Sequence, residues 1–150
     1  MIILKYVKWD EYIKLLEKLY DQVQFKQFDN IVAIGRGGSM IAAYLSSRMG
    51  IPTFCPTFVR HVGRGADMKI AVNDLCQIES LRGQLLVVDD WLSEGKAMTF
   101  ILERIPRGTT ITTLVMYCRT GSTFKPAIVG EYVTEEERDI NFPYDAIGSP

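Results

Sequence analysis

The chain has 150 residues, of which 47% are hydrophobic and 23% are charged, and its formal net charge is -1. This size and composition are typical of one globular domain, so we expect residues 1–150 to form a single domain. The near-neutral charge argues against nucleic acid or an anionic membrane as a partner, and no apolar stretch approaches the roughly 20 residues that cross a bilayer.

The cysteine and histidine content argues against a zinc site. Cys55, Cys76 and Cys118 are widely spaced in apolar runs, and His61 is the only histidine. Buried thiols of this kind are typical of a reducing compartment. The first residues are apolar for only three positions after Met1, which does not fit a signal peptide. We therefore expect a cytoplasmic protein.

The first predicted elements are a helix and a strand. Apolar residues recur on one helical face over residues 11–23, and Asp10 is a plausible N-cap. Residues 31–34 (IVAI) are rich in β-branched side chains and too short for a helix, which predicts a buried strand. This strand runs directly into the sequence GRGG at residues 35–38.

The next segment predicts a helix that starts at Ser39, as its N-cap, and ends at Gly50. Residues 53–59 have the composition of another strand. Residues 60–75 are polar and contain glycine, so we expect a mobile loop or a hairpin there.

The second half continues the same alternation. Residues 85–89 (LLVVD) predict a third buried strand, and a third helix is expected from Gly95 to Ile105. Residues 111–118 predict a fourth strand. The tail from Thr120 has turn signals and short strand-like pieces but no clear helix.

Strands that alternate with helices predict an α/β fold, with a parallel sheet flanked by helices on both faces. Ligands of such sheets bind beyond the carboxyl ends of the strands. Residues 35–38 and 89–96 both follow a predicted strand and precede a predicted helix. We therefore expect these two loops to form one site.

Three nucleotide or phosphate motifs can be compared with these loops, and none fits. In GRGGSM, Met40 replaces the third glycine of a dinucleotide-binding loop, and no acidic residue follows about 20 positions later at a strand end. The GK of EGKAMT (residues 94–99) also occurs in P-loops. A P-loop would need a glycine five residues before Gly95, where this chain has Asp90, and a hydroxyl residue in place of Ala97. The VVDD pair does not fit a response regulator, because only 60 residues follow Asp90.

A fourth comparison does fit. Residues 85–98 (LLVVDDWLSEGKAM) resemble the signature of the type I phosphoribosyltransferases, particularly the short microbial xanthine/hypoxanthine/guanine enzymes. That signature is a hydrophobic strand, two acidic residues, a few small residues and a glycine-containing phosphate loop that enters a helix. Residues 31–40 are similar to the family's pyrophosphate loop, and residues 6–12 and 140–145 are similar to its chain ends. The resemblance implies a small C-terminal hood on the α/β sheet.

The resemblance implies transfer of the phosphoribosyl group of phosphoribosyl pyrophosphate (PRPP) to a nucleobase in purine salvage, with release of pyrophosphate and with Mg²⁺ as cofactor. Positive charge develops on the ribose in such a transition state, and carboxylates beneath the ring favour it. Asp89 and Asp90 are the candidate catalytic residues and metal ligands, either directly or through a metal-bound water. The alternative is that Asp90 caps a helix and Asp89 is solvated.

The resemblance also implies two phosphate sites. Backbone N–H groups at a helix N-terminus bind phosphate well, and glycine allows close approach. GRGG could instead be a plain turn, and Lys96 or Arg64 could be simply solvated. The expected 5′-phosphate residues are Ser93, Glu94, Gly95, Lys96 and Ala97; those for pyrophosphate are Arg36, Gly37, Gly38 and, from a flexible loop, Arg64.

The resemblance implies base recognition by Arg119, which stands where the purine enzymes have a lysine and could donate two hydrogen bonds to a keto base. It also implies that Ile140 and Phe142 lie against the plane of the base. Ile140 and Phe142 could equally be ordinary core residues.

Three departures from the family pattern involve four positions. Glu94 and Ala97 replace hydroxyl residues of the phosphate loop, Ser93 replaces an aspartate, and Asp139 replaces a tryptophan that stacks on the purine. Two alternatives therefore stay open beside a 6-oxopurine transferase: a transferase for another base, and a non-catalytic regulator that binds PRPP or a nucleotide. Since dimers are common in the family, a homo-oligomer is also compatible with the resemblance.

Overall fold

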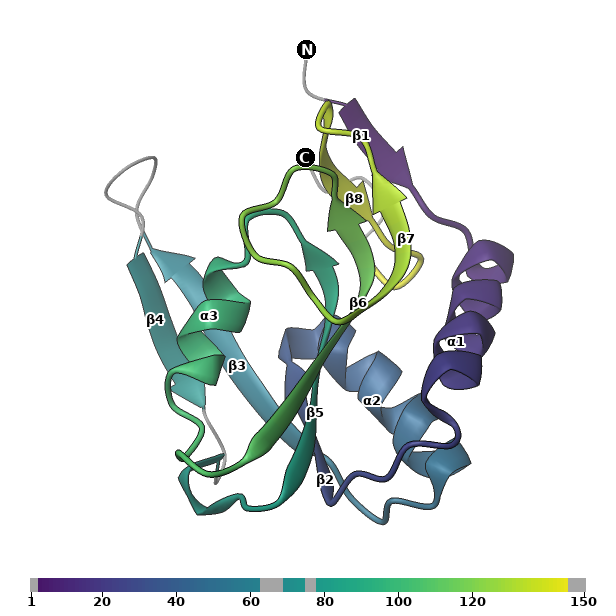
Figure 1. The fold of residues 1–150 in the computed structure, drawn as a ribbon. Helices are drawn as coiled ribbons and strands as arrows, with labels where there is room; N and C mark the ends of the chain where they lie inside the picture. The colour runs from purple at the N-terminus through teal and green to yellow at the C-terminus, as the bar shows by residue number, and fades with distance from the viewer. Residues whose placement is uncertain (1–2, 63–68, 75–77, 146–150) are drawn as a thin grey trace.

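The computed structural model describes residues 3–62, 69–74 and 78–145. Helices and strands alternate through most of this range (Figure 1). In chain order the elements are β1 (Ile3–Tyr6), α1 (Trp9–Val23), β2 (Asn30–Ile34), α2 (Gly35–Met49), β3 (Cys55–Val62), β4 (Lys69–Asp74), the 3-10 turn η2 (Ile78–Ser80), β5 (Gln84–Leu92), α3 (Lys96–Leu102), β6 (Thr110–Arg119), β7 (Ile128–Val133) and β8 (Glu137–Asn141).

The central sheet has six strands in the order β4-β3-β2-β5-β6-β7. Five neighbouring strands, β3, β2, β5, β6 and β7, pair in parallel. Strand β4 pairs antiparallel with β3 at one edge of the sheet. The predicted α/β fold with a parallel sheet is confirmed. Of the two expectations for residues 60–75, the hairpin is correct, since β3 and β4 form its arms.

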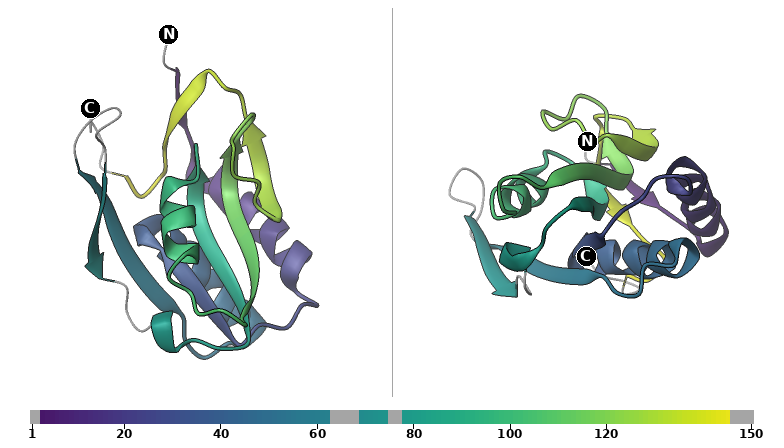
Figure 2. Two further views of the ribbon diagram at one scale, coloured as in Figure 1. Left: turned by 60° about the vertical axis from the view of Figure 1, so that its left-hand side comes forward. Right: turned by 60° about the horizontal axis from the view of Figure 1, so that its bottom comes forward.

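Helices cover both faces of the sheet, with α1 and α2 on one face and α3 on the other (Figure 2). Neighbouring strand residues therefore point into different cores. Ala33 and Val88 pack with α1 and α2, whereas Val32 and Val87 pack with α3. Burial on both sides explains why β2 and β5 are continuous apolar runs.

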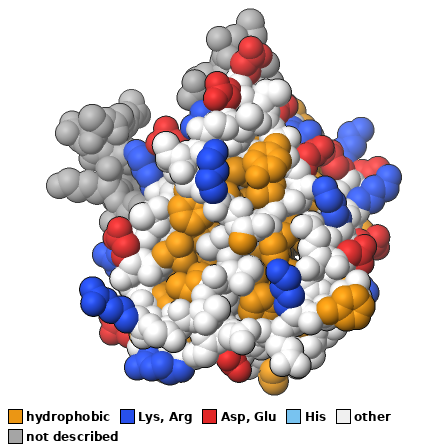
Figure 3. All heavy atoms as spheres, viewed as in Figure 1, with side chains coloured by type: hydrophobic (Ala, Val, Ile, Leu, Met, Phe, Trp, Pro, Cys, Tyr) orange, Lys and Arg blue, Asp and Glu red, His pale blue; other side chains and the backbone are white. Residues whose placement is uncertain are grey.

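The face that carries α3 is only partly covered, because α3 has just seven residues. Phe100, Phe124 and Val129 pack against this core but stay partly exposed. Hydrophobic side chains gather in the middle of this face, and positive and negative side chains are interspersed around its rim (Figure 3). None of the described helices is long and apolar enough to cross a membrane.

A second sheet of two parallel strands, β1 and β8, lies above the carboxyl ends of the central strands (Figure 1). Tyr6 is paired with Asn141, and the N–H of Val7 donates to the carbonyl oxygen of Asn141 at 2.9 Å. This small sheet is the hood that the family resemblance implies. Half of it comes from the N-terminal strand.

Two predicted helix caps are wrong. Helix α1 begins at Trp9, and the residue at its N-cap position, Lys8, makes no side-chain cap; Asp10 lies in the first turn. Helix α2 begins at Gly35 without a loop, so Ser39 lies inside the helix, where its hydroxyl donates to the carbonyl oxygen of Gly35 at 2.7 Å. GRGG is therefore the first turn of α2.

Other boundaries were closer to the prediction. Gly50 ends α2 in the left-handed conformation, with φ 71°, as expected. Helix α3 is shorter than predicted and starts after Gly95. Strand β5 is longer and continues to Leu92, so both aspartates of the acidic pair lie within a strand.

Candidate active site

The acidic pair, Asp89 and Asp90, lies near the carboxyl end of β5, between the parallel strands β2 and β6. Each carboxylate accepts a hydrogen bond from the next backbone amide: Asp90 N–H donates to Asp89 Oδ1 at 2.8 Å, and Trp91 N–H donates to Asp90 Oδ1 at 2.7 Å. Both residues are half-buried. Asp90 is not a helix cap, because Gly95 occupies that position of α3.

The two carboxylates perturb each other. Burial raises the pKa of Asp89 well above its ordinary value of 3.8, and the negative charge of Asp90 raises it further. Two adjacent carboxylates resist simultaneous ionisation unless a cation or hydrogen-bond donors compensate the charge. The pair is therefore suited to a ligand that carries hydroxyl groups, a metal ion or developing positive charge.

The first turn of α2 packs directly onto this acidic pair. A Cβ atom added at Gly37 would overlap the carboxylate of Asp90, and one at Gly38 would lie 2.5 Å from the carbonyl oxygen of Val88. The structure thus brings the predicted pyrophosphate loop and the acidic pair into contact. Gly37 and Gly38 are buried, and Arg36 between Gly35 and Gly37 is exposed, with no ion pair to any described residue.

The predicted phosphate loop connects β5 to α3. Gly95 has φ 86° and lies against Phe124, where a Cβ atom would be 2.5 Å from the Phe124 Cβ; glycine is needed for both reasons. Glu94 and Lys96 are exposed and form an ion pair, with 3.7 Å between Nζ and Oε2. The Glu94 carboxylate is thus partly neutralised. Ser93 and Ala97 are half-buried.

Arg119, at the end of β6, contacts the same loop. Its Nε donates to the carbonyl oxygen of Ser93 at 3.3 Å, and the Thr123 hydroxyl donates to the carbonyl oxygen of Glu94 at 3.3 Å. The end of β6 and the residues after it therefore fix the backbone of the phosphate loop by two hydrogen bonds. Contact between Arg119 and a base stays a prediction.

Ile140 and Phe142 have packing roles in this structure. They are only 5% and 3% exposed and belong to the core between the sheet and α1. Phe142 stacks on Tyr144 with ring centroids 5.2 Å apart and planes inclined by 6°. Base contact by Ile140 and Phe142 stays a prediction, and Arg64 lies outside the described residues.

Sequence reasoning missed a tyrosine contact with the acidic pair. The hydroxyl of Tyr144 donates to Asp90 Oδ2 at 2.5 Å. Tyr12 lies nearby on α1, and its hydroxyl is buried without a hydrogen-bond partner among the described residues. Burial, followed by the charge of Asp90, raises the pKa of Tyr12 and of Tyr144. The aromatic residues at both chain ends were a signal, but no spacing linked them to Asp90.

The residues present fit a bound Mg²⁺. Among the described residues, no three His, Cys, Asp or Glu side chains lie together as a complete metal site. Mg²⁺ usually takes one or two protein carboxylates, with waters and substrate phosphates as its other ligands. The charge repulsion between Asp89 and Asp90 fits that pattern, so these two residues are the candidate ligands.

No protein-family model matches the chain. The chain is 28% identical over 146 residues to a xanthine-guanine phosphoribosyltransferase of Idiomarina loihiensis, covering 93% of this chain and 86% of that protein. A xanthine-guanine phosphoribosyltransferase of Chromohalobacter salexigens is 27% identical over 144 residues, covering 93% and 82%.

A solved structure shows that the whole fold is shared. The purine phosphoribosyltransferase from Pyrococcus horikoshii superposes with a TM-score of 0.82 at 19% identity, covering 98% of this chain and 97% of that chain. The likeness therefore includes the hood as well as the sheet. Together with the two relatives that align along most of the sequence, it supports the resemblance of the chain to the type I phosphoribosyltransferases, a family of transferase enzymes.

Proposed function

We propose that the chain transfers the 5-phosphoribosyl group of PRPP to a 6-oxopurine base, with Mg²⁺ as cofactor and pyrophosphate as the second product. The observation that supports this most strongly is the contact between Gly37 and Asp90. It joins a glycine turn, suited to pyrophosphate, to an acidic pair, suited to ribose hydroxyls, at the carboxyl end of the sheet.

In the proposed reaction, the bond between ribose C1 and pyrophosphate oxygen breaks and a bond from C1 to a base nitrogen forms. The nitrogen loses its proton to water or to the released pyrophosphate. Asp89 and Asp90 accept hydrogen bonds from the ribose hydroxyls and stabilise the positive charge that develops on the ring. Mg²⁺, when bound, neutralises the charge of the pyrophosphate.

The phosphate groups have separate places in this proposal. The first turn of α2, with Arg36 exposed beside Gly37 and Gly38, receives pyrophosphate. The backbone of residues 93–97 receives the 5′-phosphate. The ion pair of Glu94 with Lys96 supports this assignment, because it reduces the repulsion that a free carboxylate would exert on a phosphate dianion.

The base preference follows from Arg119. Its Nε bond to Ser93 leaves the other guanidinium N–H groups as donors at the carboxyl end of β6. Donors favour a keto oxygen over the amino group of adenine. The names of the two xanthine-guanine relatives point to the same class of base.

The test is pyrophosphate release from PRPP and Mg²⁺ with a panel of guanine, xanthine, hypoxanthine, adenine, uracil and orotate. Release with a 6-oxopurine supports the proposal. Asp89→Asn and Asp90→Asn should each lower turnover about ten- to a thousandfold, the scale of lost electrostatic stabilisation, with the fold retained. Binding of PRPP without release of pyrophosphate for any base would favour the non-catalytic regulator instead.

A further inference from the structure

The contact between Tyr144 and Asp90 joins the hood to the acidic pair. We infer that Tyr144 is a positioning residue, whose hydroxyl fixes the orientation of the Asp90 carboxylate beneath the ribose. This inference rests on the proposed function. Tyr144 and Asp90 are 54 residues apart in the sequence. The Tyr144 hydroxyl donates a hydrogen bond of 2.5 Å to Asp90 Oδ2.

Tyr144 can act as a rigid donor because its ring is held on several sides. It stacks on Phe142, meets Tyr12 edge-on at 5.6 Å and lies 6.5 Å from Trp9, measured between ring centroids. A backbone turn fixes its place: Phe142 N–H donates to Asp145 Oδ2 at 2.7 Å, and Asp145 N–H donates to the Phe142 carbonyl oxygen at 2.9 Å. A hydroxyl on a ring held in this way has little freedom of direction.

Asp90 is confined from the other sides as well. Its Oδ1 accepts the N–H of Trp91, and Gly37 lies against the carboxylate. Each carboxylate oxygen has two lone-pair sites, so Asp90 can accept a ribose hydroxyl while it keeps both protein donors. Tyr144 therefore helps to hold the oxygens in place before the substrate arrives, which is the condition for electrostatic stabilisation of a transition state.

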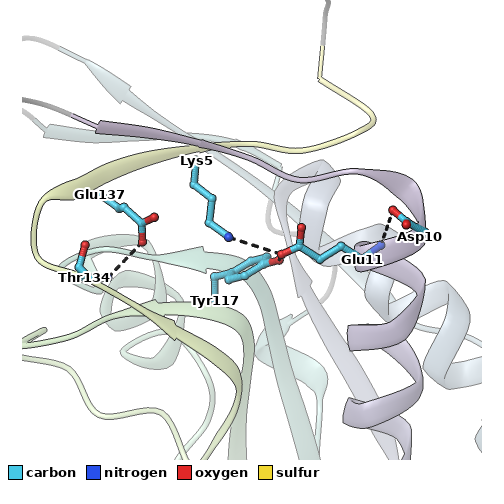
Figure 4. Close-up of polar contacts among 6 residues, drawn as sticks. All are labelled: Lys5, Asp10, Glu11, Tyr117, Thr134 and Glu137. Carbon is cyan, nitrogen blue, oxygen red and sulfur yellow. Dashed lines mark hydrogen bonds and ion pairs between the residues drawn. The ribbon is translucent and has the colours of Figure 1, made fainter.

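Tyr117 offers a matched control in the same aromatic cluster. The ring of Tyr117 lies 5.9 Å from that of Phe142, measured between centroids, but its hydroxyl donates to the Glu11 carboxylate at 2.9 Å. Glu11 also forms an ion pair with Lys5 at 3.4 Å. Figure 4 shows Lys5, Glu11 and Tyr117 converging from β1, α1 and β6. Tyr117→Phe thus removes a hydrogen-bonded hydroxyl from the cluster without removing a donor to Asp90.

The experiment is a double-mutant cycle of Tyr144→Phe and Asp90→Asn on steady-state kinetics with the best base. Tyr144→Phe keeps the ring and should lower kcat about tenfold, the value of one hydrogen bond to a charged group, while KM for PRPP changes less than about threefold. The loss should vanish when Asp90 is already Asn, because Tyr144 acts through that carboxylate. Tyr117→Phe should leave kcat within about twofold and add independently to Asp90→Asn.

Additive effects of Tyr144→Phe and Asp90→Asn, or an unchanged or higher kcat in Tyr144→Phe, would overturn the inference. Failure of the proposed function is a separate result, because it appears as an inactive wild-type protein. In that case a crystal structure of Tyr144→Phe decides the positioning role alone. A reoriented Asp90 carboxylate supports the role, and a carboxylate in its original orientation overturns it.

Discussion

Gly37 in the first turn of α2 touches the Asp90 carboxylate at the end of β5 so closely that a Cβ atom on residue 37 would overlap it. The next residue, Gly38, approaches the backbone of Val88 in the same way, with 2.5 Å left between a Cβ atom and the carbonyl oxygen. Two glycines thus allow the N-terminus of a helix to sit on the acidic end of a strand. A larger residue at either position would separate the two halves of the candidate site.

We predict that Gly37→Ala lowers kcat/KM for PRPP by about a hundredfold, because the added methyl group displaces Asp90 and small displacements of catalytic groups are costly. Steady-state kinetics measures this. Gly50→Ala is the control: its φ of 71° strains alanine, but no atom lies within 4 Å of the added Cβ. It should cost about 1 kcal/mol of stability and leave turnover unchanged. Wild-type turnover in Gly37→Ala would contradict the prediction.

A second prediction concerns stability and pH in the absence of Mg²⁺. The pKa of Asp89 is raised by burial and by Asp90, so the folded protein holds a proton that the unfolded chain releases. The free energy of unfolding should therefore fall as pH rises from about 4 through the folded pKa, by about 1.4 kcal/mol for each unit of pKa shift.

Asp89→Asn should remove this loss, and Asp90→Asn should reduce it, because the neighbouring charge disappears. Urea unfolding from pH 4 to 8 in EDTA provides the measurement. The prediction fails if wild type and Asp89→Asn have parallel pH profiles.

PRPP binding should require Mg²⁺ and should weaken about tenfold in Arg36→Ala, the loss expected for one hydrogen bond to a charged group. Arg36 is exposed beside the glycine turn and makes no ion pair with a described residue, so its charge is available to a polyanion. Calorimetry with and without EDTA tests this. Arg82→Ala is the control. Arg82 is also an exposed arginine, but it precedes the start of β5, at the other end of the strand from the acidic pair. Equal affinity with and without the metal ion would count against the site.

The base specificity should depend on Arg119. Because arginine is only a donor, 6-oxopurines should be preferred over adenine by about tenfold or more, and Arg119→Ala should reduce this preference. Steady-state kinetics with the six bases named above would measure the ratio. Higher activity with adenine or a pyrimidine, or an Arg119→Ala variant with unchanged preference, would show that the base pocket lies elsewhere.

The hood offers one gain-of-function variant. Asp139 is exposed on β8, at the position where the family resemblance implies a stacking tryptophan. Asp139→Trp should lower KM for guanine, xanthine or hypoxanthine, because an aromatic ring would cover the base. An unchanged KM for these bases, with the fold intact, would mean that residue 139 does not face the base.

The local sequence determined the main architecture. Val32 and Val87 lie in short apolar runs between helical patterns, and such runs predict buried parallel strands because each signal is contained within a few neighbouring residues. The same reasoning predicted that residues 35–38 and Asp89–Asp90 would meet, since carboxyl ends of parallel strands share one edge. It misplaced the start of α2, because GRGG gives no local sign that helical hydrogen bonding begins at Gly35.

Only the tertiary structure decided which distant side chains complete the site. The bond from Tyr144 to Asp90, the bond from Arg119 to Ser93 and the pairing of β1 with β8 join residues that no periodicity connects. These contacts depend on how the chain ends fold back over the sheet and on the register of strands that are far apart in sequence. A repeating pattern encodes which face of an element is buried, but it does not encode which residue from another part of the chain lies opposite that face.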